Sequence, residues 1–125
     1  MKNLFVFALI LTGLMMMSCG DDSGPVITIT APTEGATFSA GDDIAMTGTV
    51  TDDVEVSTMT IAVSDGILAT TDIDFSTITD KTNVPLTGVE ITLNDMTPAG
   101  DYTITVSATD DEGNTSSEDV GITVQ

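Results

Sequence analysis

From Pro25 to the last residue, apolar and polar side chains alternate along short stretches separated by turn-forming residues. A period of two places successive side chains on opposite faces of a β-strand, and closely spaced turns join such strands into a sandwich or barrel. No part of this region keeps a helical period. The sequence therefore predicts an all-β fold of about seven antiparallel strands, at residues 26–31, 44–51, 56–64, 67–75, 89–93, 102–108 and 120–124.

The same alternation predicts which side chains face the core. The expected inward residues of the second and third strands are Ile44, Met46, Gly48, Val50, Met59, Ile61 and Val63. The pattern is least regular from Ile67 to Pro85. There an exposed sheet edge could bind a partner protein through backbone groups, or could be an irregular edge without a partner.

The charge of the chain restricts its partners. Among 125 residues, 20 are acidic, the only basic ones are Lys2 and Lys81, and every acid follows position 19. Phosphate binding depends on Lys and Arg, so we exclude nucleic acid as a partner. Such acidity could indicate disorder, but the dense Val, Ile, Thr and Leu content after residue 24 favours one folded domain.

The first 18 residues have the pattern of an export signal. Lys2 precedes 14 residues, 4–17, that are almost entirely apolar. A membrane-spanning helix needs roughly 20 such residues, whereas the apolar part of a signal peptide has about 7 to 15. Met16-Met17-Ser18-Cys19 then resembles the lipobox of bacterial lipoproteins, with Met in place of the commonest Leu. The resemblance implies cleavage after residue 18 and acylation of Cys19, so that two or three acyl chains anchor the chain in a bilayer. A plain secretory signal with an incidental cysteine is the alternative.

Residues 19–24 would form the lipidated cysteine and a short acidic tether. The sequence Gly20-Asp21-Asp22-Ser23-Gly24 resembles the tract that directs some lipoproteins of Gram-negative bacteria to the outer face of the outer membrane. Gly, Ser and Asp are equally the ordinary composition of solvated linkers. We therefore expect a lipid anchor in the outer membrane, at the cell surface or facing the periplasm.

Residues 25–125 resemble bacterial immunoglobulin-like repeats. The resemblance is carried by the Gly100-x-Tyr102 start of one strand, the Ala108-x-Asp110-x-x-Gly113-Asn114 turn after it, and two N-terminal motifs, Pro25-x-Ile27-x-Ile29-x-x-Pro32-x-x-Gly35 and Gly48-x-Val50-x-Asp52-Asp53. It implies an immunoglobulin-like β-sandwich without the antibody disulfide or tryptophan. Tyr102 is expected to bury its ring and bond a backbone group, as in a tyrosine corner.

The best candidate for a chemical site is a calcium site. In such a sandwich the loop after the second strand meets the turn after the sixth, which would bring acidic groups together. Calcium takes six to eight oxygen ligands. The candidate ligands are Asp52, Asp53, Asp110, Asp111 and Glu112, with Glu55 beside them. The alternative is that these residues are solvated turn formers, and the opposite pole, with Asp42, Asp43, Asp95 and Asp101, is a weaker candidate.

Enzymatic and glycan-binding functions have little support. The chain has no His, and its single cysteine is expected to be acylated, so a nucleophile and base pair cannot be assembled from the usual residues. After cleavage the only aromatic residues are Phe38, Phe75 and Tyr102, which is a poor supply for sugar stacking. We predict a non-enzymatic binding, adhesion or structural role, no certain cofactor, no small-molecule substrate, and a surface protein as a potential partner.

Overall fold

A computed structural model describes residues 23–66, 71–72 and 75–125. Within these ranges the chain forms nine β-strands and two 3₁₀ turns, Ser64–Gly66 and Phe75–Thr77. No helix in the described ranges is long and apolar enough to cross a membrane. The strands are β1 (Val26–Ala31), β2 (Ala36–Phe38), β3 (Asp43–Thr51), β4 (Val56–Val63), β5 (Thr71–Asp72), β6 (Asn83–Pro85), β7 (Val89–Thr92), β8 (Gly100–Asp110) and β9 (Thr115–Val124).

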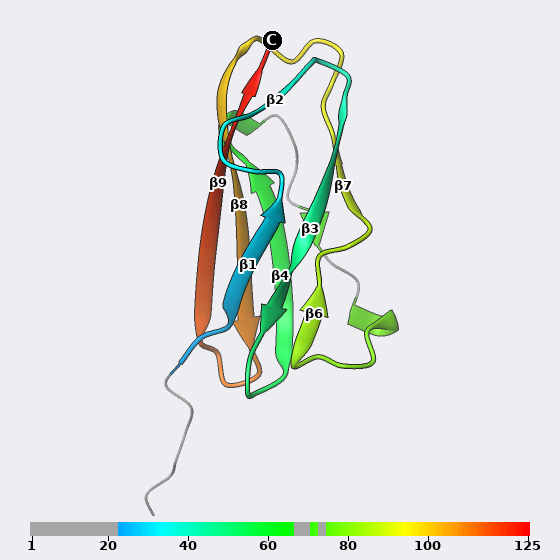
Figure 1. The fold of residues 1–125 in the computed structure, drawn as a ribbon. Coiled ribbons are helices and arrows are strands. Elements are labelled where there is room, and N and C mark those ends of the chain that lie inside the picture. Colours follow the sequence, from blue (N-terminus) through cyan, green and yellow to red (C-terminus); the bar gives the residue numbers. More distant parts are fainter. Residues whose placement is uncertain (1–22, 67–70, 73–74) are drawn as a thin grey trace, which may run out of the picture.

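The strands form two sheets that pack face to face (Figure 1). One sheet has the order β1-β3-β6, with β7 also paired to β3. The other has the order β2-β9-β8-β4-β5. The start of β1 and the C-terminal residue Gln125 lie at opposite ends of the sandwich. The predicted all-β, immunoglobulin-like sandwich is confirmed.

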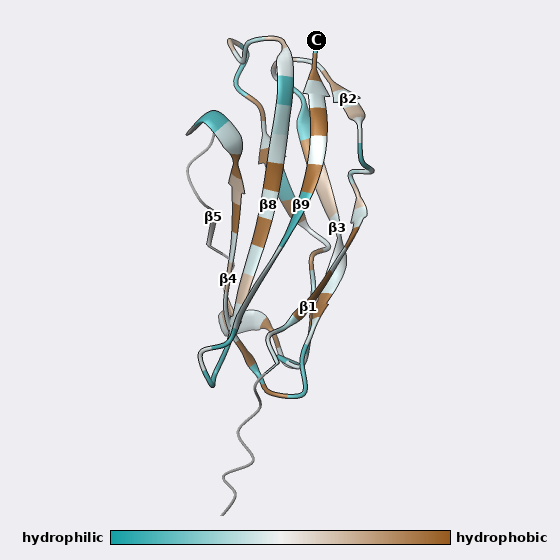
Figure 2. Cartoon of the chain, turned by 90° about the vertical axis from the view of Figure 1, so that its left-hand side faces the viewer, coloured by the Kyte–Doolittle hydropathy of each residue, from teal (hydrophilic) through white to brown (hydrophobic). Residues whose placement is uncertain are grey.

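The inward residues of both sheets form a single apolar core. Figure 2 shows the alternation as brown bands along β8 and β9. The predicted inward residues of β3 and β4 are buried, except that Gly48 is only partly so. The largest fully buried side chains are Ile44, Met46, Met59, Leu86, Leu93, Ile104, Ile122, Val50, Val56, Val84, Val106 and Val124.

Six of the seven predicted strands match strands of the sandwich, and the first, Val26–Ala31, has the predicted bounds. The fourth, expected at 67–75, lies largely outside the described residues, which include there β5 and the first residue of the second 3₁₀ turn. β2 and β6 were not predicted. Each has three residues, too few to show a periodic pattern.

One strand pair is parallel, unlike the antiparallel order predicted. After β1 the chain passes through Pro32 and Gly35 to the other sheet without reversing direction. β2 therefore runs alongside β9 in parallel, with Ala36 opposite Ile122 and Phe38 opposite Val124. All the other pairs are antiparallel.

Gly48 allows β1 and β3 to approach closely. Its φ is +150°, a conformation that residues with side chains rarely adopt. A Cβ at this position would overlap the backbone carbonyl oxygen of Thr28. The register between β1 and β3 also shifts between Ile29 and Ala31, next to the Ile29–Gly48 pair. Gly48 is thus required by a local irregularity of the sheet.

Tyr102 forms the expected corner at the start of β8. Its side chain is buried, and its hydroxyl donates a hydrogen bond of 2.8 Å to the carbonyl oxygen of Pro98. The ring packs in the core while the hydroxyl fixes the connection from β7 to β8. The predicted tyrosine corner is confirmed.

Replacing Tyr102 by phenylalanine should remove this bond and keep the ring. A hydrogen bond of this kind contributes about 1 kcal/mol net, and an unpaired carbonyl can raise the cost of its loss. We expect the free energy of unfolding of Tyr102→Phe to fall by that amount, seen in urea as a lower midpoint without a change in m value. An unchanged midpoint would mean that water replaces the hydroxyl at Pro98.

β6 and β7 lie at one edge of the first sheet. Two features limit the free backbone groups at β6 and at the residue just before it. Pro85 has no N–H, and the Asp80 carboxylate accepts hydrogen bonds from the Thr82 N–H and hydroxyl at 3.0 and 2.7 Å. These bonds, the hydroxyl bond first, hold the pKa of Asp80 below its usual value of 3.8.

Candidate functional site

The two acidic loops predicted to meet do lie together at the end of the sandwich where β1 begins (Figure 1). One is the loop between β3 and β4, and the other is the turn between β8 and β9. The Asp111 N–H donates a 2.9 Å hydrogen bond to the carbonyl oxygen of Glu55, which joins them directly. We call residues 52–55 and 110–114 together the acidic pole.

Asp110 organises the turn between β8 and β9. Its side chain is buried, and its carboxylate accepts hydrogen bonds from the Asn114 N–H and side-chain amide at 2.8 and 2.9 Å. Burial by itself would raise the pKa of Asp110. The bonds from Asn114, with those from the Glu112 and Gly113 N–H groups, outweigh burial and lower this pKa below 3.8. Asp110 therefore acts as an ionised turn former.

The loop between β3 and β4 is held mainly through its backbone. One oxygen of Asp52 accepts a 3.0 Å bond from the Val54 N–H, while the other is buried without a hydrogen-bond partner in the described chain. The Asp52 N–H and Val56 N–H donate to the carbonyl oxygens of Thr82 and Lys81. The Lys81 ammonium lies 4.0 Å from the Glu55 carboxylate, and both side chains are well exposed.

The side chains of the acidic pole do not converge as a metal site would require. Asp53, Asp111 and Glu112 are exposed, while Asp52 and Asp110 bond their own loops. Across residues 23–66, 71–72 and 75–125, no group of three Asp, Glu, His or Cys side chains could hold a metal ion. At the opposite pole, Asp42 and Asp101 likewise bond the neighbouring Ser39 N–H and Thr123 hydroxyl.

This arrangement predicts how divalent cations affect stability. Calcium and magnesium at matched ionic strength should raise the melting midpoint by the same amount, because both screen a chain with a net charge of −18. Thermal melts in each cation and in chelator provide the measurement. A rise specific to calcium that Asp52→Asn or Asp110→Asn removes would instead establish a calcium site.

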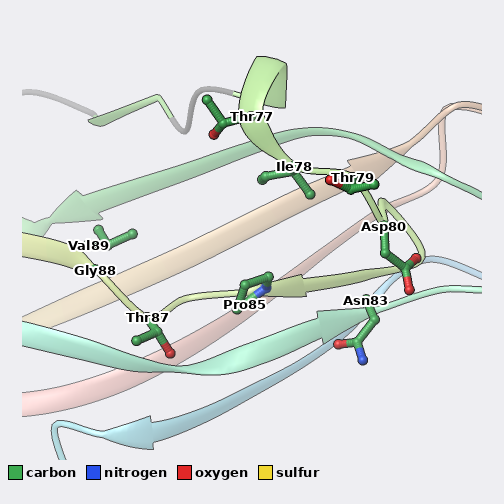
Figure 3. A pocket seen from close by; sticks show the side chains of 9 residues that line it. All are labelled: Thr77, Ile78, Thr79, Asp80, Asn83, Pro85, Thr87, Gly88 and Val89. Atoms are coloured by element: carbon green, nitrogen blue, oxygen red, sulfur yellow. The ribbon is translucent and has the colours of Figure 1, made fainter.

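A groove of about 430 Å³ lies beside the β6–β7 edge and was not predicted (Figure 3). Part of it falls in the irregular region from Ile67 to Pro85, and Thr87, Gly88 and Val89 lie beyond that region. Its two walls come from separate short segments. The segment after the second 3₁₀ turn forms one wall, and β6 with the start of β7 forms the other. Its lining residues are Thr77, Ile78, Thr79, Asp80, Asn83, Pro85, Thr87, Gly88 and Val89.

The groove lining combines apolar and polar groups. Ile78, Pro85 and Val89 provide apolar contacts, and threonine hydroxyls with the Asn83 amide provide hydrogen-bonding groups. Asp80 is its one titratable residue, and its lowered pKa keeps it ionised. A paired-carboxylate mechanism needs a second acid with a raised pKa, which this lining lacks.

The aromatic residues do not form a sugar-stacking platform in the described chain. Tyr102 is buried, and Phe38 and Phe75 are partly buried against the core. The groove lining includes no aromatic side chain. The condition that would favour glycan binding, an aromatic side chain exposed beside a groove, is thus not met by these residues.

Comparison with known proteins agrees with this architecture. The family model described as bacterial Ig domain matches residues 25–106. The fold is similar to that of the fibronectin(III)-like modules of Clostridium thermocellum CbhA, with a TM-score of 0.55, 21% identity, and coverage of 79% of this chain and 94% of that one. Murine CRIg gives a TM-score of 0.39 at 13% identity, over 81% of this chain and 96% of that one. A search of curated proteins finds no significant match.

Two packed sheets and a tyrosine corner are features of an immunoglobulin-like module. The chain belongs to the bacterial Ig domain family. Domains with this fold are typically non-catalytic, and the family indicates a structural or adhesion role.

Proposed function

We propose that the chain is an exported lipoprotein whose Ig-like domain serves a non-enzymatic adhesion or structural role at the bacterial outer membrane. The lipobox-like Met16-Met17-Ser18-Cys19 after an apolar segment carries the proposal. Cys19 and the acidic Asp21-Asp22 lie outside the described residues. The domain begins only a few residues later, since Gly24 already lies close to Thr115 and Ser116 at the start of β9.

The short tether sets the distance between domain and bilayer. Gly24 is five positions after Cys19, a span of at most about 17 Å when the chain is extended. The acidic pole then faces the membrane, where anionic head groups repel it. The opposite pole points away from the bilayer and is free to contact other surface proteins.

Palmitate labelling in the native bacterial host tests the anchor. The wild-type chain should incorporate label, lose residues 1–18 and fractionate with the outer membrane, whereas Cys19→Ala should do none of these. Ser23→Ala is the matched control, because it alters the tether and leaves the lipobox intact. Unlabelled wild-type protein in the soluble fraction would refute lipidation and favour a plain secretory signal.

Protease treatment of intact cells tests the membrane face. If the acidic tract directs surface export, wild-type domain is degraded, and the double variant Asp21→Asn, Asp22→Asn stays protected while still labelled with palmitate. Protection of both proteins would place the domain in the periplasm. Degradation of both would show that the acidic residues are only a solvated linker.

A further inference from the structure

We infer that the groove beside β6 and β7 binds an arginine side chain on an exposed segment of a partner protein. The inference gives the proposed adhesion role a partner chemistry, and it rests on that role for where the partner is met. The groove itself depends only on the described sandwich, so its ligand can be tested without the lipid anchor.

The residues of β6 direct their backbone groups to alternate sides. The bonds on either side of β6, at Thr82 and Leu86, run to β3 and the loop after it. In an antiparallel pair, residues that bond the neighbouring strand alternate with residues whose backbone groups point away from it. Asn83 and Pro85 therefore direct their backbone groups away from β3, and both residues line the groove.

The backbone groups that β6 offers on this free side are acceptors. Pro85 has no N–H, and the Asn83 N–H donates to the Asp80 carboxylate. Of the groups that β6 directs away from β3, the two carbonyl oxygens remain for a ligand. A partner strand would need donors as well as acceptors along this edge, so the edge favours a ligand rich in donors over an added strand.

Asp80 gives this set of acceptors a negative charge. Its carboxylate accepts hydrogen bonds from the Thr82 N–H and hydroxyl and from the Asn83 N–H. A carboxylate has about four acceptor sites, so these three bonds leave capacity for a ligand. The same bonds hold the pKa of Asp80 below 3.8, and the group is therefore ionised at neutral pH.

The one basic side chain of the described ranges does not neutralise this carboxylate. Lys81 follows Asp80 in the sequence, but its ammonium lies 4.0 Å from the carboxylate of Glu55. The net charge of −18 attracts cations to the whole chain, and the groove adds directed acceptors at one place. A cation from a partner complements both.

The walls of the groove suit the rest of an arginine side chain. Figure 3 shows Asp80 and Asn83 at one end of the groove and Val89 at the other. Ile78, Pro85 and Val89 offer apolar surface to the methylene stem and to the flat faces of the guanidinium. A guanidinium has several donors in one plane and is weakly hydrated, whereas the lysine ammonium is compact and strongly hydrated. Separate acceptors beside an apolar surface therefore favour arginine.

The size of the groove favours an arginine carried on a protein segment. Its volume of about 430 Å³ lies within the range of pockets that hold whole ligands. Residues next to the arginine can therefore contact Ile78 and Val89, which are only partly buried.

Titration with the capped peptide acetyl-Val-Arg-Val-amide tests the ligand. The protein is the chain from Cys19 onward, which includes every described residue, and ¹⁵N NMR follows the amide signals of Asp80, Asn83 and Val89. The peptide with citrulline in place of arginine has the same shape without the charge, and it should bind about tenfold more weakly. Equal affinities of the two peptides would overturn the inference.

Acetyl-arginine amide tests whether the ligand belongs to a protein segment. It should bind several-fold more weakly than the peptide, because it lacks the flanking side chains. Equal affinity would indicate a site for free guanidinium compounds and would overturn the protein partner.

Three substitutions locate the binding. Asp80→Asn should weaken binding of the arginine peptide about tenfold, whereas Glu118→Gln, which removes the same charge from β9 in the other sheet, should change it by less than about twofold. Pro85→Ala adds a backbone N–H to the acceptor edge and should also weaken binding. Equal losses in Asp80→Asn and Glu118→Gln would show that net charge alone attracts the peptide, and would overturn the site.

Two further measurements separate the possible failures. Urea unfolding of each variant checks that it folds, and the citrulline comparison needs no variant. Palmitate labelling of Cys19 is independent of the groove, so loss of the arginine site and loss of the proposed anchor would be distinct results.

Discussion

Replacing Gly48 with alanine should lower the free energy of unfolding by about 3 kcal/mol. Forcing an extra group into a close contact costs typically 1–3 kcal/mol, and a positive φ for a residue with a side chain costs roughly 1–2 kcal/mol. Both apply here, because the new Cβ meets the Thr28 carbonyl oxygen while φ stays near +150°. Urea unfolding followed by circular dichroism measures the change.

Gly88→Ala separates the two causes. Gly88 also has a positive φ, +91°, but a Cβ there has no atom within 4 Å, so only the conformational cost of about 1 kcal/mol should appear. If the two variants lose the same stability, the close approach of β1 and β3 is absorbed by backbone shifts, and the explanation from the Thr28 contact is wrong.

Asp110→Asn should lower the melting midpoint at pH 7 by roughly 5–10 °C, although it removes one negative charge from an acidic chain. The amide cannot accept hydrogen bonds on both side-chain atoms as the carboxylate does from Asn114. Asp111→Asn is the matched control, since its side chain is exposed on the same turn and its charge change is identical. It should melt at the wild-type temperature or slightly above.

The pH dependence of this difference follows from the lowered pKa of Asp110. The pKa of Asp110 is lower in the folded chain than in the unfolded chain, where it is near 3.8. The ionised side chain therefore stabilises the fold fully at pH values above the unfolded-state pKa. This stabilisation is lost as the pH falls through the folded-state pKa. The difference in stability between wild type and Asp110→Asn should thus be constant above about pH 5 and should decrease below pH 4. A gap that stays constant down to pH 2 would contradict this assignment.

The long strands could be predicted because burial imposes a regular period on them. In β8 every second residue faces the core, namely Tyr102, Ile104, Val106 and Ala108. This alternation is visible in the sequence and indicates the strand. The corner at Tyr102 and the turn at Asp110 were predicted because each depends on contacts within a few residues. Even the meeting of the two acidic loops follows from the fold class.

Features made by distant residues could not be predicted. The parallel pairing of β2 with β9 depends on where the chain crosses between sheets, and the Glu34–Gly121 bond joins residues 87 positions apart. The groove forms between two short segments whose separation is set by tertiary packing. Whether acidic side chains converge is likewise decided by turn geometry, which here directs Asp110 toward Asn114.

The protected edge at β6 has a consequence for molecules held side by side on a membrane. Under the anchoring proposed at Cys19, copies would diffuse in two dimensions, where exposed strand edges meet often and can join into larger sheets. At β6, Pro85 offers no N–H. Where the strand begins, the Asp80 carboxylate accepts hydrogen bonds from the Thr82 and Asn83 N–H groups. Copies that meet along this edge should therefore separate again, so that a dense layer of the protein stays laterally fluid.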